Sequence, residues 1–187
     1  MNPAHLEFCA SPEWRTIVET MILPDALRNV DLGAQVIEIG PGPGFTTDVL
    51  RKLTDRLVAV EVDPNLAVAL KTRLEGTNVE VVCGDATTLD FPDDRFSAGA
   101  SFHMLHHIAS DDAQNRAFAE LARVLRQGAH LVAADGVFSD GSLAFHEQDI
   151  YNPIDPDSLR DRLELVGFES VDVSLHDLGW FCRAVVA

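Results

Sequence analysis

The loop at residues 36–45 combines an acid with closely spaced glycines. It reads Val-Ile-Glu-Ile-Gly-Pro-Gly-Pro-Gly-Phe, with Gly40, Gly42 and Gly44 at alternate positions after an apolar run. Because glycine has no Cβ, such a loop turns tightly and lets a ligand approach the backbone. The two prolines remove amide donors that a phosphate would use. The loop therefore favours a nucleotide-like ligand without phosphate.

Acidic residues also close the next two apolar runs. Glu61 lies at the end of residues 57–62, where a carboxylate is placed to accept hydrogen bonds from ribose hydroxyls. Asp63 directly precedes a proline and is expected to cap a helix instead. Asp85 follows residues 79–83 and is a candidate acceptor for an exocyclic amine such as adenine N6, the alternative being a simple turn.

Three histidines, His103, His106 and His107, follow the fourth apolar run. Histidine is the side chain best matched to proton transfer near neutral pH. His103 is therefore the candidate base and substrate contact, and His106 a second candidate substrate contact, with core packing as the alternative for each. No sequence spacing supplies the further ligands of a metal centre, so no metal is expected.

Aromatic residues gather in the N-terminal segment and in residues 136–155. Phe8, Trp14 and Tyr151 are candidate substrate contacts that would roof an apolar pocket. The alternative is that they are ordinary core aromatics and part of a surface loop. Because residues 136–155 form an unusually long connection, they are expected to act as a substrate loop.

The elements that position these residues alternate between two patterns. Short apolar runs predict buried strands at residues 34–39, 57–62, 79–83, 98–102 and 129–134. Helical patterns occupy residues 45–54, 65–75, 113–126 and 157–166. Two closing runs, residues 168–175 and 180–186, are joined by a link short enough for a hairpin. We expect one α/β domain over residues 1–187, with residues 1–30 as a helical cap.

Charge sets expectations about partners. The chain has 14 Lys and Arg against 30 Asp and Glu, a formal net charge of −16, which repels a phosphate backbone. We therefore expect a small-molecule substrate, aromatic or lipophilic, with no nucleic acid and no membrane partner. With neither a signal peptide nor an apolar run of bilayer length in this sequence, a cytoplasmic location is expected. Nothing in the sequence indicates the oligomeric state.

Taken in order, these motifs resemble the small-molecule branch of the class I S-adenosylmethionine-dependent methyltransferases. Residues 89–96 and 105–108 continue the match, while Ser97 stands where relatives carry Asp. The resemblance implies a Rossmann-like, doubly wound seven-stranded sheet of order 3-2-1-4-5-7-6, with the seventh strand antiparallel. It also implies S-adenosylmethionine as cofactor and S-adenosylhomocysteine as product.

The resemblance further assigns roles to individual residues. It places Glu38 and the three glycines near the methionine portion of the cofactor, Glu61 on the ribose, and Asp85 with Ala86 at the adenine. Ser101 would face the methionine end and the substrate.

The implied reaction is in-line methyl transfer to an oxygen, nitrogen or carbon nucleophile. Two alternatives remain open. One is a non-catalytic protein that binds S-adenosylmethionine as a sensor or partner subunit. The other is a nucleotide-dependent oxidoreductase, although Gly44 falls one residue too early for the GxGxxG pattern of dinucleotide sites.

Overall fold

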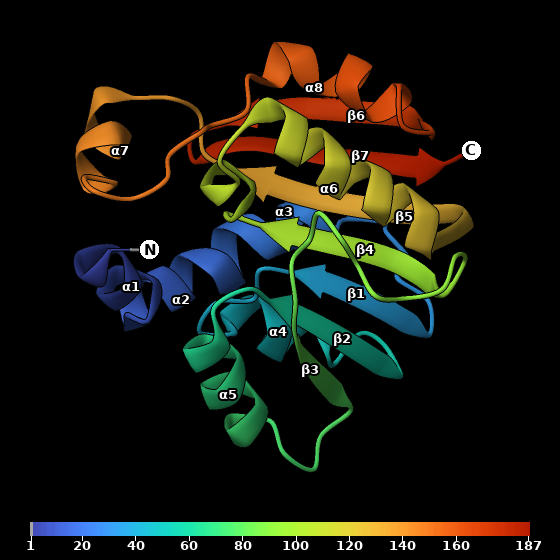
Figure 1. The fold of residues 1–187 in the computed structure, drawn as a ribbon, viewed down its shortest axis with the longest axis horizontal. Coiled ribbons are helices and arrows are strands. Elements are labelled where there is room, and N and C mark those ends of the chain that lie inside the picture. The colour runs from blue at the N-terminus through green and yellow to red at the C-terminus, as the bar shows by residue number, and fades with distance from the viewer. Residues whose placement is uncertain (1) are drawn as a thin grey trace.

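The computed structural model describes residues 2–187 and contains one seven-stranded sheet of order β3-β2-β1-β4-β5-β7-β6 (Figure 1). Strands β1 to β5 pair in parallel, and β7 runs antiparallel to both β5 and β6. The bounds are β1 Gln35–Ile39, β2 Arg56–Glu61, β3 Val79–Cys83, β4 Phe96–Phe102, β5 Leu125–Asp135, β6 Phe168–His176 and β7 Gly179–Val186. The predicted fold class and strand order are confirmed.

Helices cover both faces of this sheet. They are α1 Pro3–Cys9, α2 Pro12–Ile17, η1 Val18–Ile22, α3 Leu23–Ala26, α4 Phe45–Leu50, α5 Pro64–Arg73, η2 Leu105–His107, α6 Asp111–Val124, α7 Asp140–Phe145 and α8 Pro156–Glu164. Alternate residues of β1 point to opposite faces. Ile37 packs in the core with α6 and α8, whereas Val36 packs with η1, α3 and α4. Two hydrophobic layers therefore hold the strands in register.

Capping residues explain where two helices begin. Asp63 accepts hydrogen bonds from the backbone N–H groups of the first turn of α5, which confirms its predicted capping role. For α6 the cap is Ser110, whose hydroxyl accepts from the N–H of Ala113 at 3.2 Å. Asp111 and Asp112 lie in the first turn of α6, where negative charge interacts favourably with the helix dipole.

The helix expected to continue to Arg126 ends at Val124, because Leu125 already pairs with Phe96 of β4. The residues that follow, including Gly128, therefore lie within β5. Ser97 of β4 accepts a hydrogen bond from the N–H of Gln35 at 2.9 Å. The residue that departs from the family pattern thus joins β4 to the start of β1.

The closing hairpin approaches the end of β5 very closely. Gly179 opens β7 with φ +132°, and a Cβ placed there would lie 2.0 Å from the backbone oxygen of Asp135. Only a residue without a side chain fits this contact. The hairpin therefore rests directly on the residue that ends β5.

The N-terminal helices and α7 meet at the edge of the sheet toward which the parallel strands point (Figure 1). The Asn2 amide donates hydrogen bonds to the backbone oxygens of Phe145 and Glu147, at 2.9 and 3.2 Å. Its backbone N–H donates to Asp149 at 2.9 Å. Residues far apart in the sequence thus close over the carboxyl ends of the strands. Within residues 2–187 no helix is both long and apolar enough to cross a membrane.

Candidate active site

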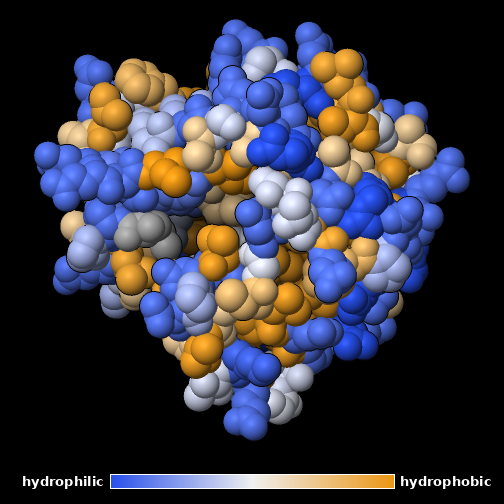
Figure 2. All heavy atoms as spheres, in the orientation of Figure 1, coloured by the Kyte–Doolittle hydropathy of each residue, from blue (hydrophilic) through white to orange (hydrophobic). Residues whose placement is uncertain are grey.

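A cavity of about 170 Å³ opens where the carboxyl ends of β1, β2 and β4 meet the N-terminal helices. In an open parallel sheet, ligands bind at this edge. Gly40, Gly42, Glu61 and Ala86 line one side of the cavity, and Trp14 and His103 line another. Figure 2 shows apolar residues gathered around a hollow in this region of the surface.

Glu61 connects the glycine loop to the turn after β2. One carboxylate oxygen accepts a hydrogen bond from the N–H of Gly42 at 3.0 Å, and the other accepts from the N–H of Asp63 at 3.0 Å. The side chain is nearly buried yet borders the cavity. It therefore offers acceptor oxygens to a ligand while fixing the loop that would hold that ligand.

Gly44 lets the start of α4 pack against α5. Its φ is +89°, and a Cβ there would lie 2.4 Å from both Leu70 Cδ1 and Arg73 Nη2. The Arg73 guanidinium donates to the backbone oxygens of Pro43 and Gly44 at 3.1 Å. Gly44 itself does not line the cavity; it supports the loop from behind.

Glu38 is buried beneath the same loop. Its carboxylate accepts hydrogen bonds from the hydroxyl groups of Thr46 and Thr47, the second at 2.7 Å. Burial raises the pKa of Glu38 to about 7, even though both hydrogen bonds favour the ionised form. Thr46 borders the cavity and Glu38 does not, so Glu38 joins β1 to α4 behind the cavity wall.

Asp85 and Ser101 also lie outside the cavity lining. Asp85 is exposed, and its carboxylate accepts from the backbone N–H and the hydroxyl of Thr87, each at 2.8 Å. Ser101 is buried in β4, and its hydroxyl has no hydrogen-bond partner within residues 2–187. Of the expected adenine contacts, Ala86 therefore borders the cavity and Asp85 forms a turn.

His103 projects from the turn after β4 and borders the cavity. It adopts φ +52°, which is uncommon for a residue with a side chain, and its N–H donates to the backbone oxygen of Ala134 at 2.7 Å. Its ring meets the Trp14 ring edge to face, with centroids 5.1 Å apart. Burial lowers the pKa of His103, so the imidazole is neutral near neutral pH.

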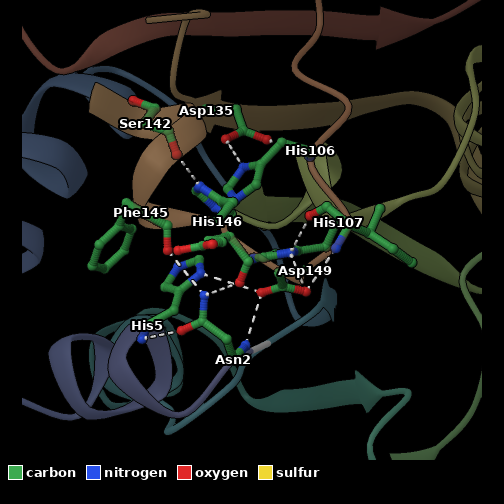
Figure 3. A network of polar contacts seen from close by, with 11 residues as sticks. Asn2, His5, His106, His107, Asp135, Ser142, Phe145, His146 and Asp149 are labelled. Carbon is green, nitrogen blue, oxygen red and sulfur yellow. Dashed lines mark hydrogen bonds and ion pairs between the residues drawn. The ribbon is translucent and has the colours of Figure 1, made fainter. Parts of the chain in front are cut away.

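Four other histidine rings pack together beside the cavity (Figure 3). This histidine cluster consists of His5 from α1, His106 and His107 from η2, and His146 directly after α7. The centroids of the His106 and His107 rings lie 4.2 Å apart, and those of His5 and His146 lie 4.5 Å apart. Only His107 of the four also borders the cavity.

The other expected substrate contacts are divided between the cavity and the histidine cluster. Tyr151 stacks on the His146 ring with centroids 4.3 Å apart, and His106 pairs with Asp135; neither borders the cavity. Phe8 is 39% exposed and packs on Trp14. Trp14 and His103 are thus the two expected substrate residues that the fold brings to the cavity.

Burial lowers the pKa of three histidines of the cluster, His5, His107 and His146. Burial lowers the pKa of His5 to about 4 and that of His107 to about 3, and neighbouring imidazoles add to both shifts. Burial alone would raise the pKa of Asp135, but the adjacent His106 holds it below the usual value. His5 and His107 are thus neutral near neutral pH, whereas Asp135 is ionised.

Sequence reasoning missed two members of the cluster and the acid behind it. His5 and His146 are remote from residues 103–107, so no spacing connects them. Asp135 ends β5 as Glu61 ends β2, and the same rule that selected Glu61 could have selected it. The expectation of no metal considered only ligands near one another in the sequence.

Known proteins are similar to this chain in sequence and in fold. The family model described as "Methyltransferase domain" matches residues 37–133, from β1 to β5. A protein named ribosomal RNA small subunit methyltransferase A, from Thermococcus onnurineus, is 45% identical over 58 residues. That match covers 31% of this chain and 21% of the relative, so the chain spans about a fifth of the relative's length.

Two solved structures share the fold over the whole chain. An S-adenosylmethionine-dependent methyltransferase from Aquifex aeolicus is 19% identical, with a TM-score of 0.76 and complete coverage of both chains. A Haloferax volcanii structure, a complex between the Trm112 methyltransferase activator and a methyltransferase, is 15% identical with a TM-score of 0.74. It covers 100% of this chain and 99% of the other.

The expectation that excluded nucleic acid is wrong. It rested on net charge, whereas the matched relative is named for ribosomal RNA, and one structural neighbour is a complex with a protein activator. Net charge describes an average field that acts on solubility and association, and it does not exclude a local contact surface. The same charge argument therefore does not decide between a small molecule and RNA as the methyl acceptor.

The matched segment holds the glycine loop, Glu61 and His103, which lie together at one cavity. That segment is a methyltransferase domain and not a dinucleotide-dependent oxidoreductase. The chain belongs to the methyltransferase domain family, whose model matches just over half of its residues.

Proposed function

We propose that the cavity holds S-adenosylmethionine with its ribose at Glu61, its adenine toward Ala86 and its methionine portion along the glycine loop. The residues fit such a molecule. A Cβ at Gly42 would meet no heavy atom within 4 Å, so the loop leaves open space there. The nearly buried Glu61 carboxylate borders the same space, where hydrogen bonds to a charged acceptor are strongest.

We further propose that the acceptor enters beside Trp14 and His103. The bound donor supplies an activated methyl group, so the chain's own task is to orient the acceptor and exclude water. The neutral His103 ring is suited to hold or accept a proton from the acceptor. The observation that carries this proposal is that Glu61, the glycine loop and His103 all border one cavity.

The acceptor that this entrance fits best is a planar aromatic or heteroaromatic group. Trp14, Phe45, Phe102 and His103 border the cavity, and aromatic rings gain from stacked and edge-to-face contacts. A nucleobase in RNA and a free aromatic compound present the same chemistry at this entrance. Because one relative is named for ribosomal RNA, RNA must be tested as a source of the acceptor.

The test begins with calorimetry of S-adenosylhomocysteine binding to the purified chain. It continues with a methyl-labelled donor supplied to two pools, total RNA and small metabolites. Binding followed by label in one pool supports the proposal and identifies the source of the acceptor, and ribonuclease treatment checks the RNA arm. Absence of S-adenosylhomocysteine binding would refute the donor site. Binding with no label in either pool would favour a non-catalytic role.

A further inference from the structure

The histidine cluster concentrates nitrogen ligands in one buried place. One ligand nitrogen from each of His5, His106, His107 and His146 lies within 4.8 Å of the other three. His5, His106 and His146 are buried, and His107 is half-buried. Imidazole nitrogen is a preferred ligand of zinc, copper and nickel ions. No contact described so far explains why four such rings converge.

Three of the rings, those of His106, His107 and His146, are oriented by a contact of their Nδ1 atom with an oxygen. His106 Nδ1 lies 2.5 Å from the Asp135 carboxylate. His107 Nδ1 lies 3.2 Å from the backbone oxygen of Ile150, and His146 Nδ1 lies 2.6 Å from that of Ser142. Metal-binding histidines characteristically donate their second N–H to a carboxylate or carbonyl group, which fixes the tautomer and aims the free nitrogen at the metal.

The nitrogens that remain are buried and unpartnered. Within residues 2–187, the Nε2 atoms of His106, His107 and His146 have no hydrogen-bond partner, and neither has Nδ1 of His5. Buried polar atoms almost always have a partner, and each exception needs an explanation. Four exceptions in one cluster are explained together by one shared cation.

We propose that His5, His106, His107 and His146 form a tetrahedral site for a divalent transition-metal ion, with Zn²⁺ as the best fit. Structural zinc is almost always bound by four ligands in a tetrahedral arrangement, and histidine nitrogen is one of its ligands. With Zn–N distances of about 2.0–2.1 Å, the ligand nitrogens lie about 3.3 Å apart. The widest separation of 4.8 Å must therefore close by about 1.5 Å. Side-chain rotation supplies movements of this size.

Acidic groups next to the cluster offset the charge of the ion. Asp135 contacts His106 directly. Asp149 Oδ2 lies 3.6 Å from His5 Nδ1, and Asp149 Oδ1 lies 3.9 Å from His107 Nδ1. Asp135 at His106 and Asp149 at His107 therefore lie behind the ligand nitrogens, as the outer partners of metal sites commonly do, whereas at His5 Asp149 lies beside the ligand nitrogen itself.

The site joins three segments that cover the cavity. His5 belongs to α1, His146 follows α7, and His107 is both a cluster member and part of the cavity wall. An ion bound by all four rings would hold α1 and the α7 segment against η2. Because side chains of the protein fill all four coordination positions, the ion would hold α1 and the α7 segment in place and would not activate substrate.

The test is metal binding by the full chain, which needs no knowledge of the methyl acceptor. Protein stripped with a chelator is titrated with Zn²⁺, and metal content is measured after gel filtration. We expect one Zn²⁺ per chain and a higher melting temperature with the ion than without it. Co²⁺ in its place should give the visible absorption of a tetrahedral site.

Two ligand variants and one control locate the ion. His146→Ala and His5→Ala should each weaken Zn²⁺ binding by more than about 100-fold, since loss of an outer partner alone costs about 10- to 100-fold. His176→Ala, an exposed histidine of β6, should bind as the wild type does. Circular dichroism verifies that each variant is folded.

Stripped wild-type protein that takes up no stoichiometric Zn²⁺ would overturn the site. Equal affinity in the wild type and both ligand variants would do the same, because the ion would then lie elsewhere. Loss in His146→Ala without loss in His5→Ala would overturn the assignment of four histidines.

Discussion

The glycine loop and the histidine cluster border the same cavity, but they are assembled differently. Each polar group of the loop region finds its partner close by: Glu38 with Thr46 and Thr47, and Glu61 with Gly42. The cluster draws its members from α1, η2 and the end of α7, and its inner nitrogens have no partner within residues 2–187. The loop region could be predicted from a sequence motif because its partners lie close together. The histidine cluster could not, because tertiary contacts bring its members together and, by our proposal, an ion completes it.

The largest effect should come from crowding the loop region. Gly44→Ala places a Cβ 2.4 Å from Leu70 and forces a left-handed backbone on alanine. Left-handed strain costs about 1–2 kcal/mol, and overpacking costs about 1–3 kcal/mol. We expect the free energy of unfolding to fall by about 4 kcal/mol, as measured with urea.

Gly76→Ala is the matched control, with φ +78° and no heavy atom within 4 Å of the added Cβ. It should cost only the backbone strain, about 1–2 kcal/mol. Equal losses in the two variants would mean that the packing of α4 on α5 contributes nothing.

The second prediction concerns pH and the buried carboxylate. Since burial raises the pKa of Glu38 from 4.5 to about 7, the folded state favours the protonated form. Its stabilising contribution is complete below pH 4.5 and is lost as the pH rises to about 7. At 1.36 kcal/mol per unit, this loss is about 3 kcal/mol.

Glu38→Gln cannot ionise, so its stability should not decline over that interval. Urea unfolding of ligand-free protein at several pH values measures the difference. Glu75→Gln, at an exposed position after α5, should retain the wild-type pH profile. Parallel profiles for the wild type and Glu38→Gln would contradict the prediction.

A third change tests whether the loop region alone holds the donor. Glu61→Ala removes the acceptor oxygens proposed for the ribose and the bonds to Gly42 and Asp63. Hydrogen bonds to a charged group contribute about 1.5–3 kcal/mol each, so affinity for S-adenosylhomocysteine should fall at least about tenfold. Asp85→Ala, outside the cavity lining, should change affinity much less. A reversed order in calorimetry would move the ribose away from Glu61.

The fourth change tests the place where the two regions meet. His103 borders the cavity and lies close in sequence to the cluster but is not part of it. His103→Ala should leave donor affinity nearly intact while lowering kcat about tenfold for a lost orienting contact, and about 100-fold for a lost general base. The His176→Ala variant should keep full turnover. A fall in stability with unchanged kcat would assign His103 to packing.

The sheet was predictable because its signals are local. Strands such as β3 are short, mostly apolar runs bounded by polar turns, and β3 has the predicted bounds. The end of α6 was not predictable in this way. Leu125 fits a helical face as well as a strand, and its pairing with Phe96 decides between them. Tertiary pairing overrides local pattern at such boundaries.

In the site, residue type and position predicted the glycine loop and Glu61, but they did not predict the orientation of every side chain. Glu38 and Glu61 both sit at strand ends, yet hydroxyl groups from α4 turn Glu38 away from the cavity while Glu61 borders it. His5 and His146 carry no local signal, because only the folding of α1 and α7 over η2 makes them neighbours.

The contact of Gly179 with Asp135 has a consequence for mutational tolerance. Gly179 has no side-chain functional group and lies in a hairpin outside the family match. A search based on motifs would therefore rank this position as freely variable. Any side chain there must displace the backbone oxygen of Asp135, which is 2.0 Å from the added Cβ. Asp135 in turn aims the His106 ring. Saturation mutagenesis should therefore find position 179 among the most restricted in the C-terminal third of the chain.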